Sequence, residues 1–553
     1  MQYIKNWLLI PLICVSSFAS ATIILKKAVE STPMAYCTDS SRLFDDFLLH
    51  RMGDTVSEKN HRKVLRNQHI RPSRYDSTAF FRIIDHFEAI KSDPKALYTF
   101  FKDMPKGGEL HYHFDGSSPA ETMLALADRG KYCLNPKTQA FKRFTTLCHG
   151  ITASQLLKNR TRYNQTIRAW SMKNFTPGPE SRLDHFFSVF AKERTIQSDF
   201  DKQLLAHIIE RAANQHELYL EVIAFHLKND SKYAQLIHST TNMRDKKRIL
   251  LSNPHFQNSI RQTIHDSDRL LKQARHILGC QKTMPRTAAC SLTVKFQYYV
   301  IREESLDQIF AQALAGFETA AQSNNVVGIN LVGGENGVIA LRDYKAQMQI
   351  FQFMHSAYPN VHIALHAGEL APDLVKPEQL LFHIHDAVFT GKAERIGHGV
   401  DITHENNRAA LIKYMSEKPV AVEINLTSNR ELLTIYGKQH PLCFYLKHHI
   451  PIVLSTDDEG ILRTDLTHQY VDAVMTYKLD YPTIKAINRN ALTYSFLPGD
   501  SLWSDAANQI YVPACRNIFG ATCLKFIKKN MKAALQWELE KKLKEFENEY
   551  SLL

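Results

Sequence analysis

The sequence lacks a long hydrophobic run, a C-x-x-C pair and a phosphate-binding loop. The apolar stretch WLLIPLICV near the N-terminus is far shorter than the roughly 20 residues needed to span a bilayer. We therefore expect no membrane span. Without C-x-x-C spacing, zinc ligation by cysteines is not indicated. Without a P-loop or similar signature, the sequence shows no dedicated phosphate site.

Glycine and proline are also few, with 21 and 20 among 553 residues. Hydrophobic residues make up 44% and charged residues 22%, which is typical of globular proteins. This composition excludes a mostly disordered, collagen-like or disulfide-knot protein. The length allows three or four domains of roughly 150 residues. It also allows one elaborated barrel, because such barrels can exceed about 400 residues.

Positive charge is in excess, with a net charge of +12 and a pI near 9.1. This balance is compatible with binding to nucleic acid, an anionic membrane or an anionic polysaccharide, but it does not determine a fold. We expect a surface property or a weak polyanion contact, and no specific recognition of nucleic acid.

The N-terminal 21 residues have the pattern of a secretory signal. Lys5 supplies the positive end, WLLIPLICV the apolar segment, and Ala19-Ser20-Ala21 a cleavage site. The alternative is a buried N-terminal helix. The pattern predicts an exported protein, periplasmic or extracellular.

The cysteines are consistent with an oxidising compartment. Cleavage after residue 21 would leave eight, of which six form close pairs, namely Cys133/Cys148, Cys280/Cys290 and Cys515/Cys523. Short, even spacing in an exported protein favours local disulfides. Spacing does not prove connectivity, and Cys37 and Cys443 are left as candidates for free thiols.

Alternating strand and helix patterns predict the fold class α/β, as a (β/α)8 TIM-type barrel with a parallel sheet. The strands are expected at 109–115, 217–226, 293–302, 326–333, 361–369, 395–400, 420–427 and 451–458. Helical patterns separate them, such as 200–216, 304–323, 342–357, 404–418 and 440–449.

The expected organisation has four parts. They are a signal peptide at 1–21, a helical extension at 22–105, a barrel at 106–500 with insertions at about 117–199 and 227–292, and a C-terminal helical segment at 501–553. The extension has helical patterns at 43–52 and 80–101. It could form a homodimer. Near the C-terminus, apolar residues recur every four positions from Ile527 to Leu543, which predicts an amphipathic helix packed on the body.

Zinc-binding and proton-transferring side chains gather where several predicted strands end. His111 and His113 share one face of their strand, because side chains alternate. A second H-x-H pair, His383/His385, lies in a helical stretch, and we interpret it as structural. Other predicted strand ends carry His366, Glu369, His398, Asp457 and Asp458. Imidazole and carboxylate are suitable zinc ligands, and barrel active sites lie at this end of the strands.

Seven motifs in order resemble the metal-dependent adenosine deaminases across about residues 90–500. They are MPKGGELHYHFDGS, GINLVGGE, HAGE, RIGHGVD, EINLTSN, STDD and NRNALTYSFL. The opening motif, the signal and the long extension are similar to the exported branch, which includes the adenosine deaminase-related growth factors and bacterial exported relatives.

The resemblance implies a role for each matching residue. One Zn²⁺ would be held by His111, His113, His366 and Asp457. Glu369 would protonate the purine N1, His398 would orient and deprotonate the attacking water, and Asp458 would bind N7. Gly333 would contact N3 through its backbone, and Asp115 would contact a ribose hydroxyl.

The chain departs from the family pattern at three places. Asn330 replaces the usual acidic residue of GIDLAG, Glu459 replaces a proline, and NLTSN replaces a proline-threonine version. None of these changes removes a metal ligand or proton-transfer group of the family pattern, so we expect them to bear on substrate selectivity rather than on the chemistry.

The resemblance predicts hydrolytic deamination of adenosine and 2′-deoxyadenosine. The alternatives are a deaminase of adenine, a 5′-modified adenosine or AMP, and an exported binding or signalling protein on the same scaffold. The segment 182–190, which contains Phe186, Phe187 and Phe190, predicts either an apolar lid or simple helix packing.

Overall fold

A computed structural model describes Cys37 and residues 77–281, 287–418 and 420–550. The predicted signal and the helical pattern at 43–52 lie outside these residues. Among the described residues, no helix is both long and apolar enough to cross a membrane.

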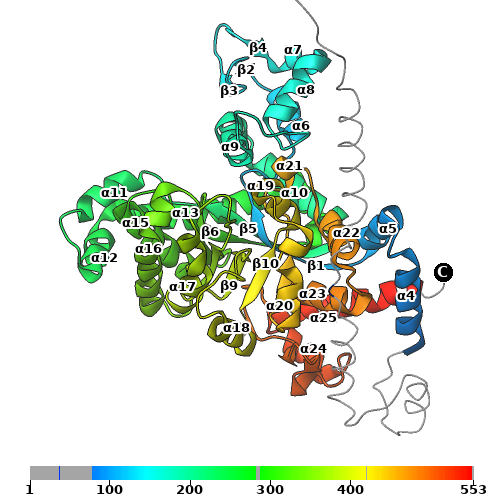
Figure 1. Ribbon diagram of the computed structural model, residues 1–553. Coiled ribbons are helices and arrows are strands. Elements are labelled where there is room, and N and C mark those ends of the chain that lie inside the picture. Colours follow the sequence, from blue (N-terminus) through cyan, green and yellow to red (C-terminus); the bar gives the residue numbers. More distant parts are fainter. Residues whose placement is uncertain (1–36, 38–76, 282–286, 419, 551–553) are drawn as a thin grey trace, which may run out of the picture.

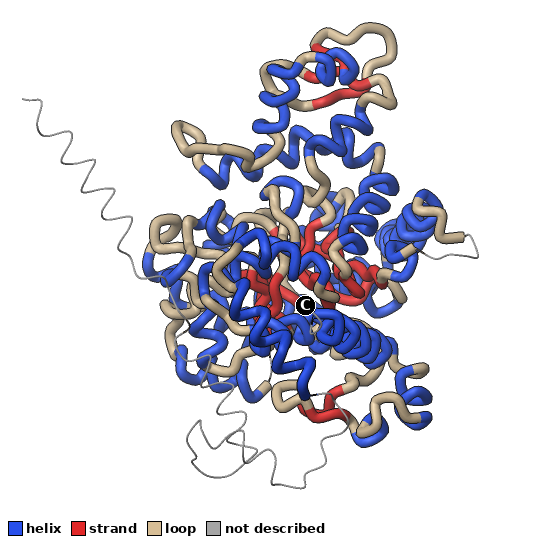
Figure 2. The backbone as a smooth tube through the Cα atoms, turned by 90° about the vertical axis from the view of Figure 1, so that its right-hand side faces the viewer, coloured by secondary structure: helices blue, strands red, loops and turns tan. Residues whose placement is uncertain are grey.

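Eight parallel strands form the predicted barrel at the centre of the molecule (Figures 1 and 2). They are hydrogen-bonded in chain order: β1 (Lys106–His113), β5 (Glu217–Phe225), β6 (Thr293–Ile301), β7 (Val326–Val332), β8 (His362–Ala367), β9 (Arg395–His398), β10 (Ala421–Ile424) and β11 (Ile452–Leu454). A parallel bridge between Tyr112 and Asp457 joins the chain after β11 to β1. The predicted fold class is therefore confirmed.

Helices that follow the strands in sequence surround the barrel. They include α10 (Asp201–Asn214), α15 (Leu306–Gln322), α16 (Val338–Ala357), α17 (His383–Phe389), α18 (Arg408–Glu417), α19 (Leu426–Leu433), α20 (Leu442–Lys447), α21 (Glu459–Leu462), α22 (Leu466–Tyr477) and α23 (Tyr481–Thr493). Helix α15 illustrates why these segments form helices that pack on the barrel. Ser305 and Gln308 form a capping box at its start, and its apolar residues are buried against β6 and β7. Short 3₁₀ helices lie at Pro377–Leu381, Gly437–Gln439 and Pro513–Cys515.

The segment after β1 forms a small lobe that projects from the barrel, at the top of Figure 1. It contains α6 (Ala120–Ala127), β2 (Tyr132–Leu134), β3 (Phe141–Arg143), β4 (Ile151–Thr152), α7 (Ala153–Lys158) and α8 (Arg160–Ala169). Trp170 is buried here, and its indole N–H donates to the Gln139 carbonyl. Trp170 is therefore part of the lobe's core. Helix α9 (Arg182–Asp199) then leads back to the barrel.

The segment after β5 forms a helical layer on the flank of the barrel. Its elements are α11 (Asp230–Ile237), α12 (Met243–Ser252), α13 (Pro254–Ile277) and α14 (Ala288–Ser291). Helices α11 and α13 contact α15, and α13 and α14 contact α10.

The helices α4 (Ser77–Ile90), α5 (Pro94–Asp103) and α25 (Met531–Tyr550) come from opposite ends of the chain and pack together. Phe87, Phe100, Tyr481 and Phe546 form an aromatic cluster between them and α23. The final helix thus packs on the body, as predicted.

The predicted apolar pattern does not run through a single helix, however. Ile527 ends α24 (Ala521–Ile527) and Met531 begins α25. The turn between them is held by Asn530, whose side chain accepts from the Asp500 N–H. A short hairpin of β12 (Trp503–Asp505) and β13 (Ile510–Tyr511) precedes α24.

Four disulfides cross-link the described cysteines. The three predicted local pairs are present. Cys37 and Cys443, whose state the sequence left open, also form a disulfide, across 406 residues of sequence. Because the two cysteines lie far apart in sequence, no local pattern indicated their contact. The tertiary fold brings them together, and the Cys37 N–H donates a hydrogen bond to the Tyr477 carbonyl.

Removing the Cys37–Cys443 disulfide should destabilise the protein more than removing Cys515–Cys523. The first closes a loop with a sequence separation of 406 and the second one of 8. In the chain-entropy description the difference is about 3.5 kcal/mol in unfolding free energy. Denaturant titration of the two double-serine variants tests this. Equal midpoints would show that the long-range link contributes no extra stability.

Candidate active site

The predicted site residues converge at the C-terminal ends of the barrel strands. Nε2 of His113 lies 3.1 Å from Nε2 of His366 and 3.3 Å from Oδ1 of Asp457. Nε2 of His111 lies 3.3 Å from the same Asp457 oxygen. Four residues on β1, β8 and the β11 loop therefore direct ligand atoms at one point.

The second ring nitrogen of each buried histidine is held by an acceptor. Nδ1 of His111 lies 2.7 Å from Glu423, and Nδ1 of His366 lies 2.8 Å from the Asn330 oxygen. An acceptor at Nδ1 favours the tautomer with its proton there, which leaves the Nε2 lone pair for the cluster. Nε2 of His111 is buried and has no hydrogen-bond partner among the described residues.

This arrangement fits a metal ion. Nε2 of His113 and Nε2 of His366 approach each other to 3.1 Å, and a cation beside them would let both present their lone pairs to it. Imidazole nitrogens with one carboxylate form a donor set suited to zinc. His398 also lies within the group of ligand atoms around Asp457, so proximity alone does not separate its role from that of His113.

Local backbone geometry positions these side chains. His398 and Asp457 have φ of 67° and 65°, in the left-handed region where non-glycine residues are strained. Glycine is required beside them: a Cβ at Gly397 would lie 2.7 Å from the His111 ring, and one at Gly116 would lie 2.2 Å from an Asp458 oxygen. The glycines of RIGHG and HFDGS thus allow close packing around the cluster.

Glu369 and His398 lie beside the candidate ligands. Oε1 of Glu369 is 3.6 Å from Nε2 of His398, which has no hydrogen-bond partner among the described residues. Nδ1 of His398 is held at 2.9 Å by Asn429. Burial raises the pKa of Glu369 above the ordinary carboxylic value, while His398 acts against this. A carboxyl group with a raised pKa and an available imidazole nitrogen therefore lie next to each other.

Asp458 differs from its neighbour Asp457. Burial, and then the charge of Asp457, raise the pKa of Asp458 well above its usual range. Burial also opposes ionisation of Asp457, but its contacts with His111 and His113 hold its pKa well below that range. The pKa values of the adjacent carboxyls are thus shifted in opposite directions. Oδ1 of Asp458 has no hydrogen-bond partner among the described residues.

Asp115 lies to one side of the cluster, two residues after β1. It is hydrogen-bonded to Gln197 and Tyr299, and burial raises its pKa to about 6. Gly333 follows β7 directly, with φ of 100°, and so lies at the same end of the barrel.

Sequence reasoning missed four buried residues of this region. Glu335 accepts from the backbone N–H groups of Gly368 and Glu369 and from His383, so it orients the HAGE turn. Glu423 and Asn429, described above, hold two of the histidines. Glu335, Glu423 and Asn429 lie inside quoted motifs, where their polarity amid apolar residues was the available signal.

The fourth missed residue, Glu193, has no such signal. It lies on α9 in the insertion, is fully buried, and neither carboxyl oxygen has a side-chain partner among the described residues. Burial and then Asp115 raise its pKa well above the usual range. The first insertion therefore reaches the mouth of the barrel.

The phenylalanines of α9 differ in how much of their side chain is exposed. Phe186 is buried, in agreement with helix packing, while Phe187 is 42% exposed. A Cβ at Gly334 would lie 3.4 Å from the Phe187 ring, which places this ring beside the β7 loop.

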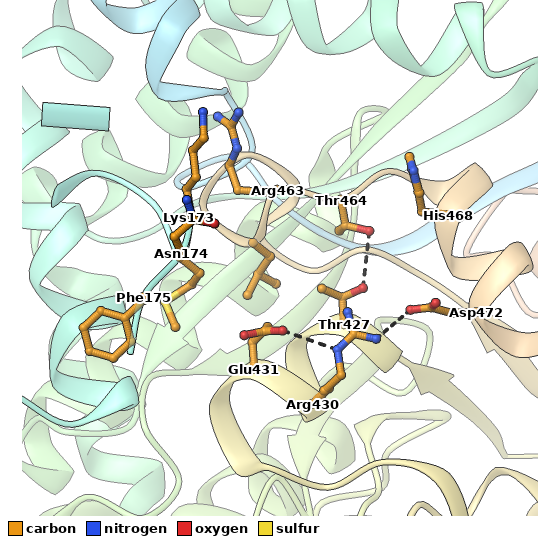
Figure 3. A pocket seen from close by; sticks show the side chains of 12 residues that line it. Lys173, Asn174, Phe175, Thr427, Arg430, Glu431, Arg463, Thr464, His468 and Asp472 are labelled. Carbon is orange, nitrogen blue, oxygen red and sulfur yellow. Dashed lines mark hydrogen bonds and ion pairs between the residues drawn. The ribbon is translucent and has the colours of Figure 1, made fainter. Parts of the chain in front are cut away.

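A separate pocket of about 480 Å³ contains none of these site residues (Figure 3). It lies between α19, α21, α22 and the segment after α8. Its Arg430 pairs with Asp472 at 2.8 Å and with Glu431 at 3.3 Å, and Thr427 bonds Thr464 at 3.3 Å. Its central polar groups thus satisfy each other.

Comparisons with known proteins agree with the site. Residues 277–504 match the family model described as adenosine deaminase. The adenosine deaminase of Klebsiella pneumoniae (strain 342) is 31% identical over 196 residues, covering 35% of this chain and 54% of the relative. Over these residues the chain is similar to the adenosine deaminase family. This family is metal-dependent, in keeping with the histidine and aspartate cluster.

One further relative and one solved structure are also similar to the chain. The adenosine deaminase of Escherichia coli (strain SMS-3-5 / SECEC) is 30% identical over 181 residues, covering 32% of this chain and 49% of the relative. The match thus spans about half the length of these curated relatives. A crystal structure of Arabidopsis ADAL complexed with IMP has a TM-score of 0.49 and 18% identity, covering 80% of this chain and 98% of that one.

Proposed function

We propose that the chain is an exported zinc-dependent hydrolase that converts adenosine and 2′-deoxyadenosine, with water, to inosine and 2′-deoxyinosine plus ammonia. The observation that carries this proposal is the convergence of three histidines and Asp457 beside Glu369, a carboxyl group whose pKa is raised by burial. A general acid, a base and a Lewis-acid site then act at one carbon–nitrogen centre.

His111, His113, His366 and Asp457 would hold the metal. Bound Zn²⁺ would supply a water ligand whose pKa is lowered to about 7. His398 offers a free Nε2 to accept the proton of the attacking water. Glu369 delivers a proton to the purine N1, which draws electrons from C6 and prepares it for attack.

The remaining polar groups would hold the nucleoside. Asp115 and Glu193 lie near each other at the mouth and can share hydrogen bonds with ribose hydroxyls. Asp458, whose pKa is raised by burial and then by Asp457, can donate to the purine N7, and the Gly333 backbone can contact N3. This leaves the exposed Phe187 ring to cover an apolar part of the substrate.

Purified protein loaded with zinc should deaminate adenosine and 2′-deoxyadenosine with release of ammonia. Adenine, 5′-modified adenosines and AMP are the competing substrates to test in parallel. A preference for one of these would replace the proposed substrate while keeping the chemistry. Turnover of none, with one zinc bound per chain, would favour the binding or signalling alternative. A homodimer through the N-terminal extension stays a prediction.

A second role is supported by the charge of the projecting lobe, here called the basic lobe (residues 120–175). It has ten Lys and Arg but only two Asp and Glu, a net charge of +8 within a chain of +12. All ten cations are exposed, whereas Tyr132, Phe141 and Trp170 are buried. Because these rings are buried, they cannot stack on nucleic-acid bases, and electrostatic attraction would dominate the binding of a polyanion. We propose a weak contact with an anionic polysaccharide.

Neutralising three cations of the basic lobe should lower affinity for heparin at least tenfold and flatten its salt dependence, because fewer counterions are released. The variant is K158Q/R160Q/R162Q, and the matched control removes three exposed cations elsewhere, K413Q/K418Q/K528Q. Elution from immobilised heparin and deaminase rate are measured together. Equal losses in both variants would show a diffuse charge effect, and stronger binding to DNA than to heparin would replace the polysaccharide.

A further inference from the structure

The barrel interior beneath the candidate metal site contains a chain of hydrogen bonds that begins at His366. Nδ1 of His366 contacts Oδ1 of Asn330 at 2.8 Å. Nδ2 of Asn330 donates to Oε1 of Gln297 at 2.9 Å. Nε2 of Gln297 donates to Glu221 at 2.9 Å and to the Leu110 carbonyl at 3.0 Å. Asn330, Gln297 and Glu221 are all fully buried.

The donor and acceptor roles along these hydrogen bonds are determined at the end farthest from His366. The Leu110 carbonyl can only accept, so it requires the NH₂ side of the Gln297 amide. Glu221 also accepts, because it receives hydrogen bonds from Arg395, the Tyr219 hydroxyl and the Phe496 N–H. Oε1 of Gln297 must therefore point at Asn330.

That orientation requires a donor at residue 330. Asn330 supplies one with Nδ2, which leaves its Oδ1 for the Leu331 N–H at 2.8 Å and for His366. A carboxylate there would serve the Leu331 N–H and His366 equally well, but its second oxygen would face Oε1 of Gln297. Turning the Gln297 amide to relieve this would instead place its oxygen against Leu110 and Glu221.

We infer that Gln297 and Asn330 form a matched amide pair that holds His366 with its Nε2 lone pair facing the metal cluster, so that this barrel requires asparagine at 330. This accounts for the departure of GINLVGG from the acidic family pattern. The inference rests on the proposed metal site. Gln297 and Asn330 are positioning residues, since they act through His366.

The two buried histidines are consequently held differently. Nδ1 of His111 contacts the Glu423 carboxylate, whose other oxygen is paired with Arg395 at 2.6 Å. Nδ1 of His366 contacts the neutral amide of Asn330. Residues that hold metal-ligating histidines affect metal affinity about 10–100-fold when altered.

The substitution N330D, which restores the acidic residue, should lower zinc affinity about 10–100-fold rather than raise it. In the Q297M background, where no oxygen faces residue 330, N330D should cost less than about threefold, because the repulsion is absent. Zinc affinity is measured by competition with a chromogenic chelator, and the visible spectrum of the Co²⁺ form reports the ligand geometry.

N488D is the matched control. Asn488 is equally buried and its amide is oriented at both ends, by the Gly107 N–H at 2.6 Å and the Pro105 carbonyl at 2.8 Å, away from the cluster. It should lower stability without changing zinc affinity or the cobalt spectrum.

Unchanged or tighter zinc binding by N330D, or an equal loss in both backgrounds, would overturn the matched pair. If N330D does not fold, Q297M alone should weaken zinc about tenfold, and an unchanged affinity would overturn it. Wild-type protein that binds no zinc would instead refute the proposed function.

Discussion

Replacing Glu369 with glutamine is expected to lower the deamination rate by about 10²–10⁴-fold while one zinc stays bound per chain. The amide has nearly the same shape but carries no transferable proton, and a general acid contributes about this factor. Because burial raises the pKa of Glu369, the wild-type carboxyl keeps its proton to higher pH than an ordinary glutamate. The wild-type rate should therefore fall as pH rises through that pKa, and the residual rate of E369Q should lack this decline.

E405Q is a suitable control for this experiment. Glu405 is also buried with a raised pKa, about 7, but it accepts from the backbone N–H groups of Ile384 and His385, outside the cluster. It should affect stability and leave the rate intact. Loss of zinc in E369Q would show that Glu369 is a ligand instead, and an unchanged rate would assign the proton to another group.

The substitution D457N should lower zinc affinity at least ~100-fold, more than loss of an outer partner costs, and activity should fall with it. Asparagine tolerates the left-handed backbone at this position, so the loss reports the missing charge rather than strain. Metal analysis after dialysis against a chelator provides the measurement.

D458N is the natural comparison, because the two carboxyls are adjacent and their pKa values are shifted in opposite directions. Burial and then the charge of Asp457 raise the pKa of Asp458 and so favour its neutral form, which asparagine resembles. D458N should keep one zinc per chain and lose turnover only. If both variants lost zinc equally, the two aspartates would act as one ligand pair.

Much of the barrel was predictable because the sequence patterns of its strands and helices are local. The alternation of apolar runs such as 326–333 with helical segments depends on residues a few positions apart, and each predicted strand overlaps an observed one. Strand ends were less accurate. The run 420–427 ends as a strand at Ile424, since α19 begins at Leu426.

The candidate site was predictable for a related reason. In a parallel barrel the C-terminal ends of all strands lie at one face, so His111, His366 and Asp457 meet there once the strands are placed. Glu193 could not be found in this way. It comes from an insertion whose path depends on packing, and no short-range pattern marks a buried glutamate on a charged helix.

The sequence by itself determined the barrel, the local disulfides and the motif residues around the candidate zinc site, because each depends on spacing along the chain. Only the tertiary structure decided the Cys37–Cys443 link, the position of Glu193 and the pairing of Gln297 with Asn330. These contacts join residues far apart in sequence, and their formation depends on strand register and side-chain orientation. The lack of a phosphate loop is consistent with the proposed neutral nucleoside, while the excess charge is concentrated in the basic lobe.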